Sequence, residues 1–115
     1  KIDMPLMLIG GSLDDFTFNE LRPTYDALPL PKYKIEIERA GHMSFTDICR
    51  AELPVPELAE LCDQEVYIDI DRAFFIINVY ATAYFRYYLK NDQSMAAYLG
   101  PDYAVGLEEV SFEAE

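Results

Sequence analysis

Residues 4–17 read MPLMLIGGSLDDFT, and this stretch decides the fold class. It opens with six apolar residues in a row, and two glycines stop the run. A short run that is apolar on both faces and ends in glycine is typical of a buried strand in a parallel sheet. The turn after the glycines is polar and carries Asp14 and Asp15. We therefore expect an α/β fold with acidic side chains at the carboxyl end of this strand.

A helix and a second strand are expected next. Residues 21–28 have helical character, and Pro23 fits there only if it lies in the first turn. Residues 32–38 alternate strictly between apolar and charged side chains, which is typical of a half-buried strand near a sheet edge. A stiff connector at residues 53–56 (LPVP) and a helical turn at residues 57–62 follow.

The longest element is a helix expected from Asp69, a favourable N-cap, to about Lys90. Its apolar residues recur with spacings of three and four on one face: Ile70, Phe74, Ile77, Ala81, Tyr84 and Tyr88. Residues 94–99 predict one more short helix, and residues 105–115 form an acidic tail that we expect to fray. Because two strands cannot bury both faces of a sheet, we expect residues 1–104 to be part of a larger α/β domain.

Charge and hydropathy exclude several kinds of partner. The chain has 9 basic and 21 acidic side chains among 115 residues, and its net charge is −12. Such a negative field repels nucleic-acid phosphates and anionic lipid head groups. No apolar run reaches the roughly 18–20 residues that a membrane span needs. We therefore expect no nucleic-acid partner and no membrane span.

Two titratable side chains follow the two expected strands at corresponding places. Asp14 follows the first strand, and His42, the sole histidine, follows the second within Gly41-His42. The carboxyl ends of neighbouring parallel strands meet at one edge of a sheet, so an acid–histidine pair is geometrically natural there. The alternatives are structural: Asp14 or Asp15 caps the next helix or forms an Asx-turn, and His42 is an ordinary loop residue.

Three segments in this order resemble the C-terminal part of the α/β-hydrolase fold. MPLMLIGGSLDDFT resembles its seventh strand and acid turn, in which an Asp is followed three residues later by Thr. KIEIERAGHMSFTD resembles its eighth strand and Gly-His loop, and VYATAYFRYYLKND resembles its closing helix. The run HMSFTDIC is most similar to the branch of predicted dienelactone hydrolases, platelet-activating-factor acetylhydrolase-like enzymes and bacterial polyester hydrolases. The resemblance covers residues 3–100 and implies that Asp14, rather than Asp15, is the acid of a Ser-Asp-His triad with His42.

The nucleophile of that family is missing from this sequence. No G-x-S-x-G motif is present, and Ser12, Ser44, Ser94 and Ser111 do not fit one. The resemblance therefore implies that the serine and the oxyanion hole lie upstream, in the N-terminal remainder of the hydrolase domain, on the same protein or a separate chain. The expected substrate is a small carboxylic ester or lactone. Three alternatives remain: a serine peptidase, a dienelactone hydrolase with a Cys nucleophile, or a non-catalytic binding or structural domain.

Other residues have secondary roles in this interpretation. Phe16, Met43 and Phe45 flank the acid and the histidine, and they either line an acyl pocket or simply pack in the core. Cys49 and Cys62 fit either a disulfide or two buried thiols; relatives in the resembled branch have a disulfide here, which implies a secreted or periplasmic protein. With one histidine and no CxxC motif, we expect no metal and no cofactor.

Overall fold

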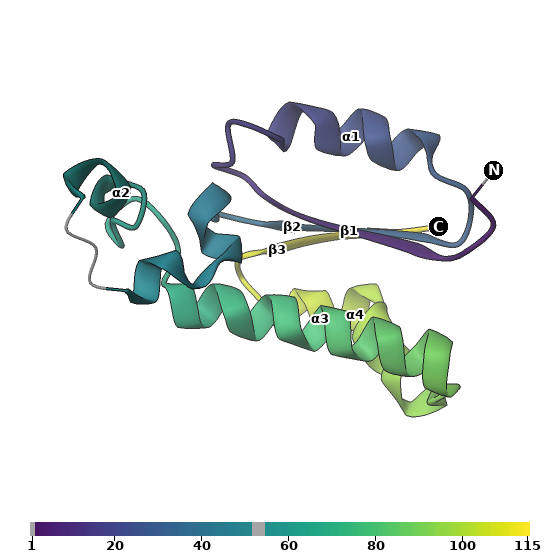
Figure 1. Ribbon diagram of the computed structural model, residues 1–115. Coiled ribbons are helices and arrows are strands. Elements are labelled where there is room, and N and C mark those ends of the chain that lie inside the picture. Colours follow the sequence, from purple (N-terminus) through teal and green to yellow (C-terminus); the bar gives the residue numbers. More distant parts are fainter. Residues whose placement is uncertain (1, 52–54) are drawn as a thin grey trace.

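The computed structural model describes residues 2–51 and 55–115 and shows a mixed α/β unit around one sheet. The helix α1 (Phe18–Ala27) covers one face of the sheet. The helices α3 (Ile70–Lys90) and α4 (Pro101–Val105) lie on the other face (Figure 1). This arrangement is a three-layer α/β/α sandwich.

The sheet has three strands, one more than the sequence indicated. The strands β1 (Leu6–Gly11) and β2 (Lys32–Ile37) are parallel, and β3 (Val110–Ala114) pairs antiparallel with β2. Two expectations were therefore wrong. The acidic tail expected at residues 105–115 is not a frayed segment, because Val110–Ala114 within it form β3. The strand β2 is the central strand rather than one near the edge.

The acidic end of the chain supplies carboxylate partners to two buried lysines of β2. Lys32 and Lys34 are only 6% and 4% exposed, although the alternating pattern placed them on a polar face. Both lie against the ring of Tyr25 from α1. Their ammonium groups pair with Glu115 and Glu113, at 3.0 and 3.1 Å. Because a buried charge is costly unless it is paired, these contacts favour the pairing of β3 with β2.

The long helix α3 was predicted correctly in extent but not in the face that it buries. The Asp69 carboxylate accepts a hydrogen bond from the Arg72 backbone at 3.0 Å and so caps the helix. Asn91, in the left-handed conformation, ends it. The buried residues lie one position away from the predicted stripe, at Ala73, Ile76, Tyr80 and Ala83. Ala73, Ile76 and Tyr80 belong to one core cluster with Ile35 and Ile37 of β2.

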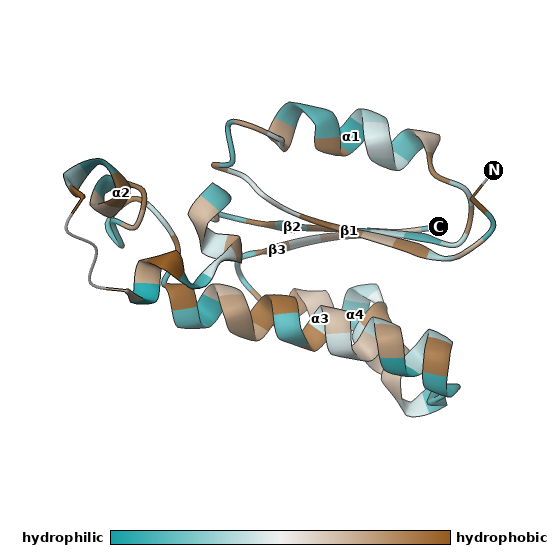
Figure 2. Cartoon of the chain, in the orientation of Figure 1, coloured by the Kyte–Doolittle hydropathy of each residue, from teal (hydrophilic) through white to brown (hydrophobic). Residues whose placement is uncertain are grey.

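The helix α1 also departs from expectation, because it begins three residues earlier. Pro23 is therefore its sixth residue rather than part of its first turn. A proline at this position lacks the N–H that would bond to the Asn19 carbonyl. The helix continues past it, with Tyr25 buried against the sheet. Figure 2 shows that α1 is mostly polar, whereas β1 and α3 carry many apolar residues.

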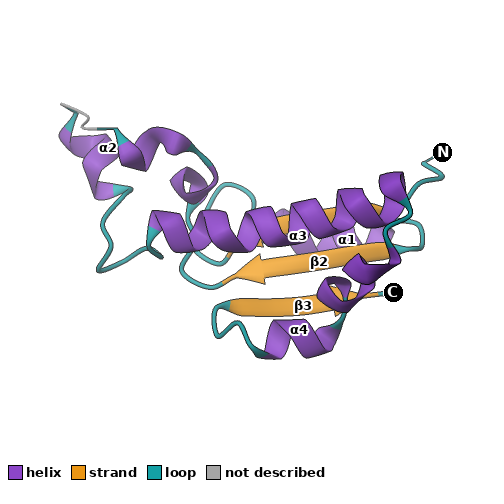
Figure 3. Cartoon of the chain, turned by 90° about the horizontal axis from the view of Figure 1, so that it is seen from below, coloured by secondary structure: helices purple, strands orange, loops and turns teal. Residues whose placement is uncertain are grey.

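The remaining elements are short. The 3₁₀ helices η1 (His42–Phe45) and η2 (Asp47–Arg50) follow β2, α2 (Pro56–Glu60) comes next, and η3 (Gln93–Leu99) follows α3. Part of the expected connector, residues 53 and 54, lies outside the described residues. Seen from the α3 side, α3 runs in the general direction of the strands and α4 lies beside β3 (Figure 3). None of the helices described here has the length and apolarity that crossing a bilayer requires.

Candidate active site

Two loops converge at the carboxyl ends of the parallel strands β1 and β2. The acid loop, defined as residues 12–17, follows β1, and η1 begins directly beyond the loop that follows β2 (Figure 1). Backbone hydrogen bonds join the two loops: the Ser12 N–H donates to the Ile37 carbonyl at 3.0 Å, and the Leu13 N–H donates to the Ala40 carbonyl at 2.9 Å. The acid loop is therefore fixed relative to the end of β2.

These loops bring Asp14 and His42 into contact. The Nδ1 atom of His42 lies 3.1 Å from Oδ2 of Asp14 and 3.3 Å from Oδ1. These distances are within hydrogen-bond reach, and they match the acid–histidine part of a catalytic triad. The contact is made by Asp14 and not by Asp15, which is exposed.

The Asp14 carboxylate is buried and has two further donors. The Thr17 hydroxyl donates to Oδ2 at 2.8 Å, and the Phe16 N–H donates to Oδ1 at 3.1 Å. Burial raises the pKa of Asp14, but the hydrogen bonds from His42, Thr17 and Phe16 together outweigh it and leave the pKa below its ordinary value of 3.8. Asp14 thus forms the Asx-turn that was its structural alternative, and it remains an anion facing His42.

The imidazole of His42 is placed between a buried acid and open solvent. Its side chain is 50% exposed, whereas that of Asp14 is 6% exposed. Within the described part of the chain, the second ring nitrogen, Nε2, has no hydrogen-bond partner. Phe16 is 78% exposed, and its ring centre lies 5.2 Å from that of His42. The Nε2 side is therefore accessible to a further group, and Phe16 lies beside it.

Two glycines allow close packing around the site, because a side chain at either position would clash with a neighbouring residue. A Cβ on Gly11 would lie 2.2 Å from the Ala40 carbonyl oxygen, and one on Gly41 would lie 2.6 Å from the ring of Tyr67. Gly41 has φ −103°, which other residues adopt readily. The packing of Tyr67, and not the backbone conformation, therefore excludes a side chain at Gly41.

Sequence reasoning missed three residues that shape the site: Ser12, Arg39 and Ser44. The buried Ser44 hydroxyl accepts a hydrogen bond from the Gly41 N–H at 3.0 Å and so begins η1 at His42. Its spacing of three residues from Gly41 is that of a helix cap, but Gly-x-x-Ser lacks the residue types that mark a capping box in a sequence. The contacts of Ser12 and Arg39 join segments far apart in the sequence, and no local pattern indicates them.

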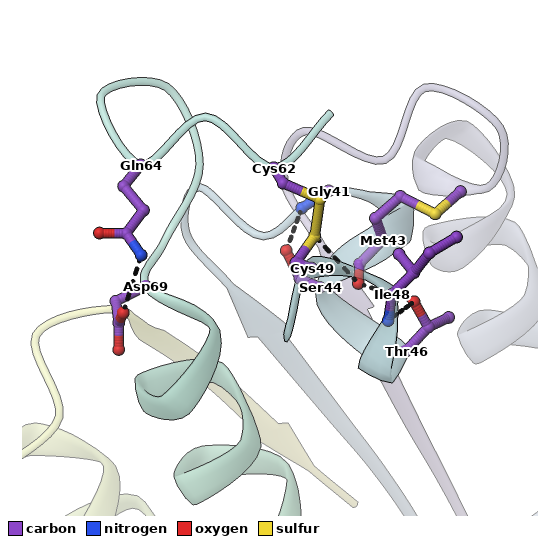
Figure 4. Close-up of a disulfide and its surroundings, with 9 residues drawn as sticks. All are labelled: Gly41, Met43, Ser44, Thr46, Ile48, Cys49, Cys62, Gln64 and Asp69. Carbon is purple, nitrogen blue, oxygen red and sulfur yellow. Dashed lines mark hydrogen bonds between the residues drawn. A yellow bond between two sulfur atoms is a disulfide. The ribbon is translucent and has the colours of Figure 1, made fainter. Parts of the chain in front are cut away.

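Cys49 and Cys62 form a disulfide in the structure, with Cα atoms 5.4 Å apart (Figure 4). The bond joins η2 to the turn after α2 and so closes the segment that follows His42. The Cys49 sulfur also lies 4.0 Å from the Met43 carbonyl oxygen. The disulfide therefore lies near the backbone of Met43, the residue that follows His42.

The expected acyl-pocket residues lie in different surroundings. Phe16 is exposed beside His42, Met43 is half-buried, and Phe45 packs against the hydrophobic core. A cavity of about 400 Å³ lies elsewhere, and its lining comes from α3 and from η3. Neither Asp14 nor His42 lines this cavity. Of the three expected acyl-pocket residues, Phe16 is the one whose ring is shown against the imidazole of His42.

The described residues contain no cluster of three or more His, Cys, Asp or Glu side chains suited to a metal ion. Comparisons of the chain with models of known protein families, with curated proteins and with solved structures gave no match.

Proposed function

We propose that this chain contributes the acid and the histidine of a Ser-Asp-His triad to an α/β-hydrolase that cleaves small carboxylic esters or lactones. Asp14 is the acid, His42 is the general base, and the nucleophile belongs to a segment outside this sequence. The proposal combines the resemblance of the strand and loop motifs with the observed contact between the two side chains.

The observation that carries the proposal is the contact between a buried carboxylate and the Nδ1 atom of a half-exposed imidazole. A carboxylate at Nδ1 keeps the proton on that nitrogen and leaves Nε2 as the base. The Thr17 hydroxyl and the Phe16 N–H favour the ionised form of Asp14. A histidine that serves only packing would not need one ring nitrogen bound to a buried carboxylate and the other turned toward solvent.

In the proposed reaction the serine oxygen attacks the ester carbonyl while Nε2 of His42 takes the serine proton. The imidazolium is stabilised by the Asp14 carboxylate, which stays ionised. His42 then gives the proton to the departing alkoxide, and an acyl-serine remains. Water then attacks the acyl group while His42 accepts its proton. As the bond between the acyl carbon and the serine oxygen breaks, His42 gives that proton to the serine oxygen, and the carboxylic acid and free serine are released.

The large accessible surface and the open strand edge of the chain support the proposal that a further part of the domain packs on it. Its accessible surface is 7323 Å², whereas a folded monomer of this mass exposes about 6,400 Å². In the described residues β1 pairs only with β2, so its other edge is open. A groove of about 280 Å³ lies between this strand and α1. We infer that the N-terminal remainder of the hydrolase packs on this side.

The experiment is a test of the complete protein that contains this chain. A fluorophosphonate probe should label it, and hydrolysis of a short-chain nitrophenyl ester should be measurable. His42→Ala should abolish both labelling and hydrolysis, because the serine then lacks its base. The exposed Arg86, which pairs with Asp92 at the far end of α3, offers a control: Arg86→Ala should leave hydrolysis unchanged.

The outcomes separate the proposal from its alternatives. Labelling by a thiol reagent instead of the fluorophosphonate would indicate a Cys nucleophile. Cleavage of peptides in preference to esters would indicate a peptidase. If His42→Ala retains most of the ester hydrolysis, the triad is refuted, and a binding domain becomes the better account.

A further inference from the structure

The segment that carries His42 leaves the sheet at the end of β2 and returns to the same place. The described parts of this excursion are residues 42–51 and 55–68, and they include η1, η2, α2 and the disulfide. At its base the Ile68 N–H donates to the Arg39 carbonyl at 2.8 Å. Arg39 is therefore the residue at which the excursion is closed.

The Arg39 guanidinium donates hydrogen bonds to backbone carbonyls of residues 64–67, in the part of the excursion that returns to the sheet. Its Nε donates to the Val66 carbonyl at 3.0 Å. Its Nη2 lies 2.9, 3.1 and 3.3 Å from the carbonyl oxygens of Gln64, Glu65 and Tyr67. In the described part of the chain Arg39 makes no ion pair. Its contribution here is thus directional hydrogen bonding rather than charge neutralisation.

The backbone of Arg39 holds the acid loop at the same time. Its N–H donates to the Ser12 hydroxyl at 2.8 Å, and Ser12 lies two residues before Asp14. Arg39 has φ 62°, in the left-handed region, and the other described non-glycine residue with positive φ is the helix cap Asn91. Arginine has no preference for this conformation, which is unfavourable for residues other than glycine. The surrounding hydrogen bonds offset that cost.

We propose that Arg39 is a positioning residue that fixes the distance and orientation of His42 relative to Asp14. It joins the acid loop through its N–H, the excursion through its carbonyl and guanidinium, and His42 through the short link of residues 40 and 41. Arg39 then acts on the contact between Asp14 and His42 through the backbone, beside the hydrogen bonds from Ser12 to Ile37 and from Leu13 to Ala40. The proposal rests on the proposed function only for its activity readout.

The fork shape of the guanidinium provides a sharp variant. Arg39→Lys keeps the charge but cannot reach several carbonyl oxygens in one plane. Arg39→Gly removes the side chain and at the same time relieves the left-handed backbone. Ser12→Ala removes only the link to the acid loop, and Arg86→Ala is the control for the loss of an exposed arginine.

The first measurement uses no substrate. In the complete protein labelled with ¹⁵N-histidine, the His42 signals are assigned by their absence in His42→Ala. The wild type should show the proton fixed on Nδ1. Both Arg39 variants should shift His42 toward a mixture of tautomers, Ser12→Ala should do so to a smaller extent, and Arg86→Ala should match the wild type.

The second measurement is the kinetics of ester hydrolysis. Misplacement by about 1 Å can reduce turnover on the order of 100-fold, so both Arg39 variants should lower kcat by about 10- to 100-fold while KM changes little. Circular dichroism identifies any variant that does not fold. If both Arg39 variants fail to fold, the result for Ser12→Ala decides the test. Unchanged His42 signals in the folded variants would overturn the positioning role, even if kcat falls. Shifted signals in a protein without hydrolase activity would support the positioning role and refute the proposed function.

Discussion

Two neighbouring aspartates, Asp14 and Asp15, differ in every contact that matters for the proposed chemistry. Asp14 is buried and touches His42, Thr17 and the Phe16 backbone. Asp15 is exposed. The spacing of three residues between Asp14 and Thr17 distinguished them in the sequence, and the structure gives the reason: the threonine hydroxyl donates to the acid.

Substitution of these two residues tests that difference. Asp14→Asn should reduce turnover by on the order of 10⁴-fold, because an amide can hold the wrong imidazole tautomer. Asp15→Asn, the matched control, should stay within a few-fold of the wild type. The measurement is kcat for a short-chain nitrophenyl ester in the complete protein. Equal losses in the two variants would contradict the assignment of Asp14.

The lowered pKa of Asp14 also predicts how stability depends on pH. A carboxyl whose pKa is lower in the folded state stabilises that state above its unfolded pKa, near the ordinary value of 3.8. This contribution is lost as the pH falls through the lowered folded value. Urea unfolding should therefore show the wild type losing its advantage over Asp14→Asn in this acid range, and Asp15→Asn should follow the wild type. A constant difference between wild type and Asp14→Asn down to the lowest pH would argue against a lowered pKa.

At the scale of elements, the sequence predicted what depends on local pattern. The strand β1, the alternating β2 and the long α3 follow from runs and periods of a few residues. The strand β3 was missed although residues 110–114 (VSFEA) alternate between apolar and polar side chains, a local signal for a strand. Its pairing with β2 was beyond local pattern, because Glu113 and Glu115 find their lysine partners about 80 positions away. The buried stripe of α3 was misplaced for a related reason, since its position is set by contact with Ile35 and Ile37 rather than by the helix itself.

The disulfide cross-links the His42 excursion, and we predict that removing this bond lowers the free energy of unfolding of the protein. Cys49 and Cys62 are 13 positions apart, and closing a loop of about that length contributes about 3 kcal/mol in the chain-entropy account. The double variant Cys49→Ser/Cys62→Ser should lower the free energy of unfolding by a similar amount. Urea unfolding of the complete protein with and without a reductant measures this. If reductant also changes the double variant, the effect does not come from this bond.

At the scale of the whole molecule, the chain is more extended than an independent domain of its length. Its radius of gyration is 15.1 Å, whereas about 13 Å is usual for 115 residues. Several large apolar side chains are exposed, including Met4, Phe85 and Leu89. Exposed apolar groups and an open strand edge favour association with another surface.

The chain expressed by itself should therefore be aggregated or molten. We expect binding of a hydrophobic dye, retained far-ultraviolet circular dichroism and weak near-ultraviolet signals. The complete protein, measured in parallel, should show none of the dye binding. A sharp cooperative thermal transition of the isolated monomer would contradict this prediction.

The burial of Lys32 and Lys34 between α1 and the paired end of β3 has a practical consequence for chemical labelling. Amine-reactive acylating reagents need access to an unprotonated amine. These two amines are held by carboxylates and covered by Tyr25, whereas Lys90 at the end of α3 is exposed. Peptide mapping after brief acylation therefore distinguishes chains in which β3 is docked from those in which it is not. The extent of acylation at Lys32 and Lys34 therefore reports whether β3 is paired with β2.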